Sequence, residues 1–159
     1  MPIKIACDIG GVILDQGGKS SSKIDLTDDA IISLKLIVEK FKAENVFIIS
    51  KAGEKFQNEM MHKLKTKDFF DRTGILIEHV HFIAEYEDKR TKCDELKIKY
   101  MIDDNIKVIR YLVDSPTTSI WFGSTGNMKL LDKKYINKVV LCPQWKTVRK
   151  FFEKFGKCG

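Results

Sequence analysis

Short apolar runs alternate along this chain with longer segments in which apolar residues recur at helical spacing. An apolar run of about four to eight residues, bounded by polar residues, is typical of a buried β-strand. Strands that alternate with helices indicate a mostly parallel sheet with helices on both faces. The strands expected from these runs are Ile3–Asp8, Val46–Ser50, His79–Ala84, Lys99–Ile102, Thr118–Phe122 and, as a sixth candidate, Lys138–Cys142.

The segments between these runs have the apolar period of amphipathic helices. We expect helices at Ala52–Lys65, Asp88–Leu96 and Ile106–Leu112, another through Ile31, Leu34, Val38 and Phe41, and a last one from Trp145 through Val148, Phe151, Phe152 and Phe155. Thr27 is expected to cap the helix that contains Leu34, with Asp28 and Asp29 in its first turn, where acidic side chains suit the helix dipole. The expected fold is α/β, a Rossmann-like three-layer αβα sandwich formed by residues 1–159 as a single domain.

Composition narrows the class of protein further. The 159 residues, 43% of them hydrophobic and 31% charged, suffice for one globular domain with its own core. A net charge of +6 favours anionic partners such as phosphoesters, nucleotides or nucleic acid. The four cysteines form no Cys-x-x-Cys pair, which disfavours a zinc site or a disulfide framework. No signal peptide or membrane-spanning run is visible, so we expect a cytoplasmic protein with no membrane partner.

Polar residues stand at the ends of three expected strands. Asp8 ends the first strand and is followed by two glycines, Ser50 ends the second, and Asp103 and Asp104 end the fourth. Ligands bind at the strand ends of open α/β sheets, so these side chains should share one edge of the sheet. A carboxylate there is costly unless it is paired or holds a metal, although a turn-forming aspartate is the structural alternative for Asp8.

These residue types suit phosphoryl transfer. A carboxylate can attack phosphorus and form an aspartyl phosphate. Mg²⁺ takes oxygen ligands and keeps several waters, so a few carboxylates and a substrate phosphate suffice to hold it. A hydroxyl and a lysine can orient and neutralise the phosphoryl oxygens, because this chemistry depends mainly on positioning and electrostatics.

Four segments in order resemble the motifs of the haloacid dehalogenase superfamily, whose members are mostly Mg²⁺-dependent phosphatases. They are Asp8-Ile-Gly-Gly-Val, Phe47-Ile-Ile-Ser50, Asp88-Lys-Arg-Thr-Lys-Cys-Asp-Glu-Leu-Lys-Ile98 and Met101-Ile-Asp-Asp-Asn105. Residues 87–105 most resemble the small nucleotidase-like phosphatases of that superfamily. The resemblance runs from Ile3 to about Leu112 and implies a phosphorylated substrate, either a nucleotide, a small phosphoester or a macromolecular phosphate.

The resemblance also implies roles for individual residues. Asp8 would be the nucleophile and a ligand of Mg²⁺, and Ser50 would bind the phosphate. Lys89 would stabilise the phosphoryl charge, and its spacing to Asp103 favours it over Lys92 for that role.

Three further positions follow from the same motifs. The backbone carbonyl of Gly10 and the carboxylates of Asp103 and Asp104 would complete the magnesium site. Apart from the motifs, Lys51 follows Ser50 in the sequence and could contact phosphate, with a solvated lysine as the alternative.

The sequence departs from the superfamily pattern at Gly10, where its phosphatases usually carry an acid/base aspartate. The loss of general acid–base help typically costs about 10²–10⁴ in rate. Asp15 is the nearest carboxylate in sequence that could replace it. The segments after Asp8 and after Ser50 are too short for a cap domain, so a capless, open site is expected.

Two other functions stay open beside the phosphatase. Gly10 motivates a catalytically inactive relative that binds or regulates, and the positive charge motivates a nucleic-acid-binding protein, although no nucleic-acid-binding motif is present. The sequence around Gly17-Gly-Lys-Ser20 lacks the first glycine of a P-loop and is interpreted as part of a glycine- and serine-rich loop, Gln16–Lys23. His79 and His81 are interpreted as structural.

Overall fold

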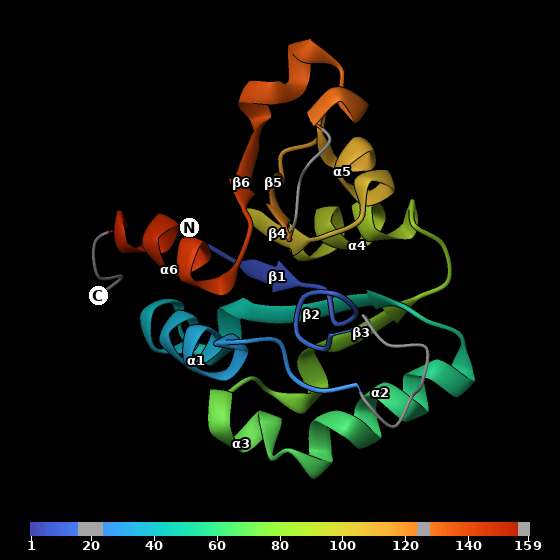
Figure 1. Ribbon diagram of the computed structural model, residues 1–159, viewed down its shortest axis with the longest axis vertical. Coiled ribbons are helices and arrows are strands. Elements are labelled where there is room, and N and C mark those ends of the chain that lie inside the picture. The colour runs from blue at the N-terminus through green and yellow to red at the C-terminus, as the bar shows by residue number, and fades with distance from the viewer. Residues whose placement is uncertain (16–23, 124–127, 156–159) are drawn as a thin grey trace.

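A single parallel sheet organises the molecule. The computed structural model describes residues 1–15, 24–123 and 128–155, and within them six strands pair in the order β3-β2-β1-β4-β5-β6, every pair parallel (Figure 1). The strands are β1 (Ile5–Cys7), β2 (Val46–Lys51), β3 (Val80–Ile83), β4 (Tyr100–Asp103), β5 (Thr118–Phe122) and β6 (Val139–Cys142). All six expected strands are confirmed, most of them displaced by only one or two residues at an end.

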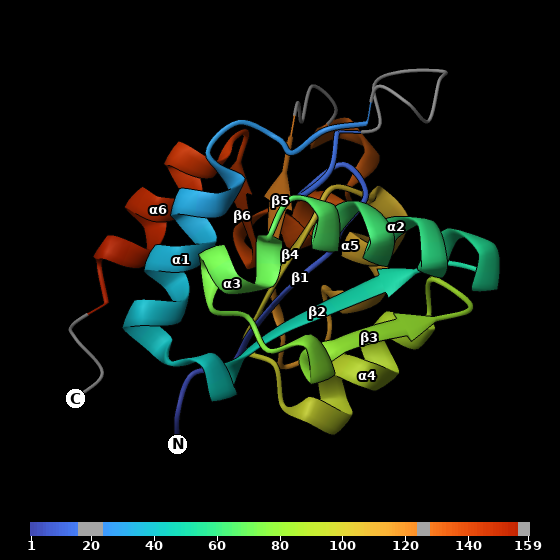
Figure 2. The same cartoon turned by 90° about the horizontal axis from the view of Figure 1, so that it is seen from below.

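Helices cover both faces of this sheet. They are α1 (Ala30–Phe41), α2 (Glu54–Thr66), α3 (Phe69–Thr73), α4 (Asp88–Leu96), α5 (Ile106–Leu112) and α6 (Trp145–Glu153), with short 3₁₀ turns η2 (Ala43–Asn45), η3 (Ile77–His79), η4 (Met128–Leu130) and η5 (Lys133–Lys138). Buried residues of α1, α2, α3 and α6 pack in one core cluster, and those of α4 and α5 contribute to another on the opposite face. Figure 2 shows α1 beside α6, and α4 next to β3. The expected three-layer αβα sandwich is therefore confirmed, with no additional domain in the described chain.

Alternation along the strands divides the core between these two layers. Ile5 and Cys7 of β1 pack in the same cluster as Trp145 of α6, whereas Ala6 between them packs with Cys93 of α4. Both faces of β1 are thus buried, which explains why it appears in the sequence as a continuous apolar run. Burial raises the pKa of the Cys7 thiol well above its usual range, so this cysteine behaves as a small core residue.

The start of α1 differs from the sequence expectation. Thr27 does not cap the helix, and Asp29 at the N-cap has a left-handed backbone (φ 65°) and no side-chain capping bond. The Thr27 hydroxyl instead donates to the carbonyl of Val12 (2.6 Å) and accepts from Nε1 of Trp145 (3.0 Å). The Thr27 side chain, which local capping rules assign to the helix, is therefore engaged in tertiary hydrogen bonds instead.

The strand order creates a crevice beside β1. After β1 the chain builds β2 and β3 on one side, and it then crosses to place β4 on the other side. The carboxyl ends of β1 and β4 flank this reversal, which is where open α/β sheets bind ligands.

No helix in the described ranges is long and apolar enough to span a membrane. The loop expected at residues 16–23 lies outside the described residues.

Candidate functional site

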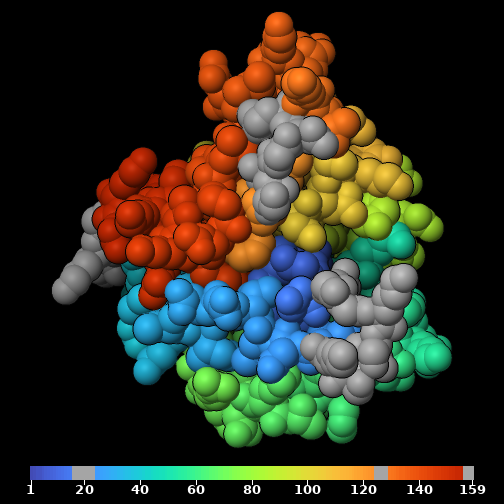
Figure 3. Space-filling model, viewed as in Figure 1, coloured from blue at the N-terminus to red at the C-terminus, as the bar shows by residue number. Residues whose placement is uncertain are grey.

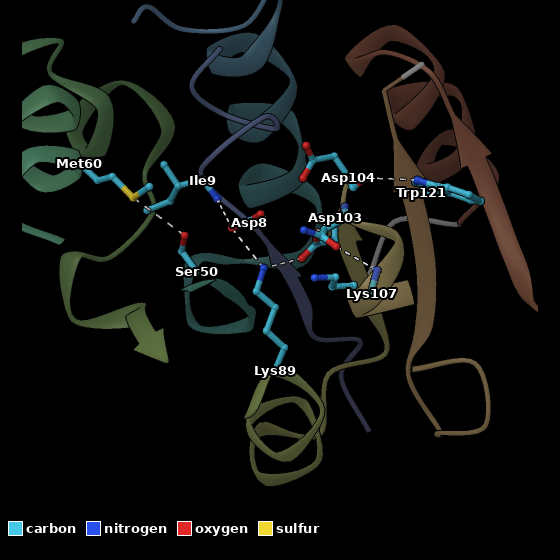
Figure 4. Close-up of polar contacts among 10 residues, drawn as sticks. Asp8, Ile9, Ser50, Met60, Lys89, Asp103, Asp104, Lys107 and Trp121 are labelled. Carbon is cyan, nitrogen blue, oxygen red and sulfur yellow. Dashed lines mark hydrogen bonds and ion pairs between the residues drawn. The ribbon is translucent and has the colours of Figure 1, made fainter. Parts of the chain in front are cut away.

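Two aspartates at neighbouring strand ends form the centre of the candidate site. Cys7 pairs with Ile102, so Asp8, directly after β1, lies beside Asp103, the last residue of β4. The backbone amide of Asp8 donates to the carbonyl of Ile102 (3.0 Å). Lys89 enters from the first turn of α4 and inserts its ammonium between the two carboxylates (Figure 4). Its Nζ lies 2.5 Å from Oδ2 of Asp103 and 3.2 Å from Oδ1 of Asp8.

Burial makes this triad strongly coupled. The Lys89 side chain is only 2% exposed, and the side chains of Asp8 and Asp103 are 11% and 0% exposed. Burial alone would lower the pKa of Lys89, but the charges of Asp103 and Asp8 outweigh it and raise that pKa above its usual range, so the lysine stays protonated. Burial and the charge of Asp8 raise the pKa of Asp103 despite the opposing effect of Lys89.

Asp104 adds a third carboxylate at the solvent side of the triad. Partial burial, followed by the charge of Asp8, raises its pKa to about 6. Gly11 packs directly under this side chain, because a Cβ built on Gly11 would lie 2.1 Å from Oδ2 of Asp104. Gly11 also has a left-handed backbone (φ 78°), so both its conformation and its surroundings exclude a larger residue.

The three carboxylates are close enough to share one cation. Asp8, Asp103 and Asp104 each offer an oxygen, and these oxygens all lie within 4.8 Å of one another. A bound cation would favour the ionised form of all three carboxylates, whose charge exceeds that of the single Lys89 ammonium. Hard oxygen donors with excess negative charge fit Mg²⁺ better than a softer transition metal.

The turn after β1 is held by its own backbone. The carbonyl of Ile9 accepts from the amides of Val12, Ile13 and Leu14 at 3.2, 2.8 and 3.0 Å. The amide of Ile9 donates to Oδ1 of Asp8 (2.8 Å), which fixes the carboxylate against the turn. This geometry follows from the glycine pair, since Gly11 supplies the positive φ that the reversal needs.

A small polar pocket opens beside the carboxylates. Its volume is about 150 Å³, and it is lined by Asp8, Gly10, Ser50, Lys51, Met60, Tyr86, Lys89, Asp104 and Asn105. Lys51 and Lys107 approach the Tyr86 ring at 4.8 and 5.4 Å from its centroid, so positive charge gathers at this end of the site. In the space-filling view, blue atoms of the N-terminal segment reach the surface near the yellow atoms around α5 (Figure 3).

The site residues expected from sequence come together in this region. Asp8, Gly10, Ser50, Lys51, Lys89 and Asp104 all line the polar pocket, and Asp103 lies behind it, bonded to Lys89. Ser50 is 1% exposed, and its hydroxyl approaches the sulfur of Met60 at 4.0 Å. Lys92, the alternative to Lys89, instead pairs with Glu95 on the surface of α4.

Two of the three histidines, His79 and His81, lie apart from this site, beside β2. His79 stacks on Phe47, with 4.3 Å between ring centroids, and its Nδ1 contacts the carbonyl of Val46 at 3.0 Å. His81 also contacts the Phe47 ring, and burial lowers its pKa. Within the described chain, only the three aspartates gather closely enough to hold a metal, in agreement with the structural interpretation of the histidines.

Sequence reasoning missed several residues of the site. Tyr86 lies in the connection between β3 and α4, where no periodicity marks it, and Met60 was assigned only to an amphipathic helix. The backbone amide of Asn105 donates to Oδ1 of Asp103 (3.0 Å). The side-chain oxygen of Asn105 caps α5 by accepting from the backbone amide of Lys107 (2.9 Å). Its position directly after the two aspartates was the available signal for that role.

Comparison with known proteins defines the fold and no more. Searches of protein-family models and of curated proteins find no match to this chain. Among solved structures, it is similar to a de novo designed protein with a Rossmann 3x3 fold, determined by solution NMR. The TM-score is 0.54 and the identity 10%, over 96% of this chain and 94% of the designed one. The chain therefore has a Rossmann-like three-layer α/β fold with a parallel sheet, and the Asp8/Asp103/Asp104 cluster at the sheet edge is its candidate site.

Proposed function

We propose that this protein is a Mg²⁺-dependent phosphomonoester hydrolase of the haloacid dehalogenase type, with Asp8 as the nucleophile. The observation that carries the proposal is the buried triad in which Lys89 lies between Asp8 and Asp103, with Asp104 beside them. The four sequence motifs supply its residues in the order that the resemblance implies. A strongly coupled group of buried ionisable residues in a crevice is typical of a catalytic site.

The reaction would proceed in two displacements at phosphorus. An Asp8 carboxylate oxygen attacks, the bond from phosphorus to the leaving oxygen breaks, and that oxygen keeps the electron pair. Water then attacks the aspartyl phosphate, releasing inorganic phosphate and restoring the carboxylate, while a water proton ends on the leaving oxygen. Both donors described for Asp8, the Ile9 amide and Lys89, meet Oδ1, which favours Oδ2 as the attacking atom.

Other residues of the pocket would bind and orient the phosphoryl group. The Lys89 ammonium and the buried Ser50 hydroxyl face the pocket that the phosphate would fill, and Lys51 adds charge at its mouth. Asp8, Asp103 and Asp104 would hold Mg²⁺, together with the Gly10 carbonyl that the resemblance implies. Bound Mg²⁺ would neutralise charge on the transferring phosphoryl oxygens.

Phosphate release from a panel of phosphomonoesters tests this proposal, with and without Mg²⁺. We expect activity that requires the metal and that Asp8→Asn abolishes, because an amide cannot form the phosphorylated intermediate. Asp114→Asn is the matched control, since Asp114 pairs with Arg90 on the surface outside the site. Turnover without metal, or turnover that survives Asp8→Asn, would contradict the proposal.

The glycine at position 10 favours one alternative, a non-catalytic protein that binds Mg²⁺ or phosphate. Gly10 lines the polar pocket at the point where the resemblance implies an acid. In that case calorimetry would detect binding of Mg²⁺ or inorganic phosphate, while the same panel would give no product. Hydrolysis at an ordinary enzymatic rate would exclude this alternative.

A further inference from the structure

We propose that the substrates are phosphomonoesters of small phenols, with the aromatic ring held in an apolar pocket beside the phosphate site. This inference rests on the proposed function and names its substrate class. Two independent observations support it: the shape of the second pocket and the absence of a carboxylate at position 10.

The apolar pocket adjoins the polar one. It is lined by Gly10, Leu14, Ile24, Phe56, Glu59, Met60 and Lys63, and it shares Gly10 and Met60 with the polar pocket. A substrate that fills both would place its phosphate beside Asp8 and its leaving group between the turn after β1 and the first turns of α2. Gly10 would then lie at the junction, next to the bond that breaks.

The size and lining of the pocket suit a single ring. Its volume is about 140 Å³, and an apolar cavity of about 150 Å³ accommodates benzene. Phe56 lies on this wall with 60% of its surface exposed, although a phenylalanine at that exposure gains little from folding. A bound aromatic ring would cover Phe56 and contact Met60, whose thioether packs well against ring edges.

The absence of an acid at position 10 also favours phosphomonoesters of phenols. A leaving oxygen that receives no proton departs as an anion, and a phenol has a pKa near that of tyrosine, about 10. An alkyl alcohol has a pKa closer to that of water, about 16, and needs protonation to leave. Asp15 lines neither pocket, and Glu59, which lines the apolar one, is exposed to solvent. Without a carboxylate at position 10, the junction of the two pockets favours a leaving group that departs as an anion.

Rates on matched substrates provide the first test. We expect kcat/KM for phenyl phosphate to exceed that for ethyl phosphate and glycerol 1-phosphate by about 10²–10⁴, the usual contribution of an acid. Free phosphotyrosine and a phosphotyrosine peptide, run beside phenyl phosphate, distinguish a small-molecule source of the ring from a protein source. Equal rates on aryl and alkyl esters would overturn the inference, and would point to a proton donor such as Glu59.

Inhibitor affinity tests the pocket separately from the chemistry. Phenylphosphonate should bind at least about 10-fold more tightly than methylphosphonate, because only its ring enters the apolar pocket. Phe56→Ala should reduce that ratio and raise KM for phenyl phosphate, whereas Tyr111→Ala, which truncates an exposed aromatic residue of α5 outside both pockets, should change neither. An affinity ratio near one, or a ratio unchanged by Phe56→Ala, would overturn the inference.

Gly10→Asp tests the leaving-group argument from the opposite direction. Gly10 has no positive φ, so its backbone conformation admits an aspartate, and it lines both pockets. We expect this variant to gain activity on ethyl phosphate while changing little on phenyl phosphate. A folded variant, judged by an unchanged melting transition, that gains no alkyl activity would contradict the argument. If the unmodified protein hydrolyses no phosphomonoester at all, the proposed function itself fails.

Discussion

At the scale of single residues, one tight approach in the site is between the backbone of Gly11 and the carboxylate of Asp104. The position of the Asp104 carboxylate therefore depends on the absence of a side chain at residue 11. The sequence indicated only that the chain bends after Asp8. It could not indicate which glycine meets which carboxylate, because that contact joins residues 11 and 104 across two strands.

Gly11→Ala should therefore weaken Mg²⁺ binding. The added Cβ would collide with the Asp104 carboxylate and would also strain the left-handed backbone. We expect the Mg²⁺ dissociation constant to rise by about 10–100-fold, as when other groups that orient metal ligands are altered. Titration calorimetry measures this change.

The control for that substitution is Gly53→Ala. A Cβ at Gly53 meets nothing within 4 Å, and its φ of −72° suits any residue. Gly53→Ala should bind Mg²⁺ as the unmodified chain does. If Gly11→Ala folds and also binds unchanged, Asp104 takes no part in holding the metal.

At the scale of elements, the sequence predicted best where periodicity and local signals agree. The helices Asp88–Leu96 and Ile106–Leu112 have the expected bounds, and the strand Thr118–Phe122 does as well. The predicted cap of α1 was wrong because Thr27 forms hydrogen bonds with Val12 and Trp145, far away in the sequence. Such tertiary partners produce no periodic pattern in the sequence. The strand ends carrying the aspartates were predictable, since topology fixes where parallel strands end.

Thr27→Val should destabilise the fold by removing the hydroxyl that ties the turn after β1 to α6. The carbonyl of Val12 and Nε1 of Trp145 would lose a partly buried partner, although they keep their bond to each other (3.0 Å). We expect a loss of about 1–3 kcal/mol in the free energy of unfolding, measured by urea denaturation.

Thr66→Val provides the comparison for this substitution. The Thr66 hydroxyl donates to the carbonyl of Lys63 (2.9 Å) at the exposed end of α2. Its loss should change stability by no more than about 0.5 kcal/mol. Equal effects of the two substitutions would show that the Thr27 hydroxyl contributes nothing beyond an ordinary surface bond.

At the scale of the whole molecule, the acidic cluster should make stability depend on pH when no metal is bound. The folded protein raises the pKa of Asp103 and raises that of Asp104 from 3.8 to about 6, so it holds these protons more tightly than the unfolded chain. The contribution of these two aspartates to the free energy of unfolding is greatest below pH 3.8, and it is lost as the pH rises through their pKa values in the folded protein. Lys89 remains protonated over this pH range and therefore does not add to the pH dependence of stability.

The contribution of Asp104 should therefore appear between about pH 4 and pH 6 as a loss of roughly 1 kcal/mol, reduced by its contact with solvent. Urea denaturation at several pH values, with a chelator present, measures it as the difference between the unmodified chain and Asp104→Asn. The variant should lose less stability over that interval. If the free energies of unfolding of the two proteins change in parallel with pH, the pKa of Asp104 does not differ between the folded and unfolded states. Added Mg²⁺ should stabilise the unmodified chain most near neutral pH.

The division of labour between sheet and helix has an evolutionary consequence. The reactive groups stand on buried strand ends, where most changes would disturb the core, whereas Phe56 and its neighbours stand on the outer surface of α2. Surface substitutions usually change stability by less than about 0.5 kcal/mol. Under the proposed function, substitutions along α2 would change the ring sizes and substituents that the apolar pocket accepts at little risk to folding, while the phosphate site would stay unchanged.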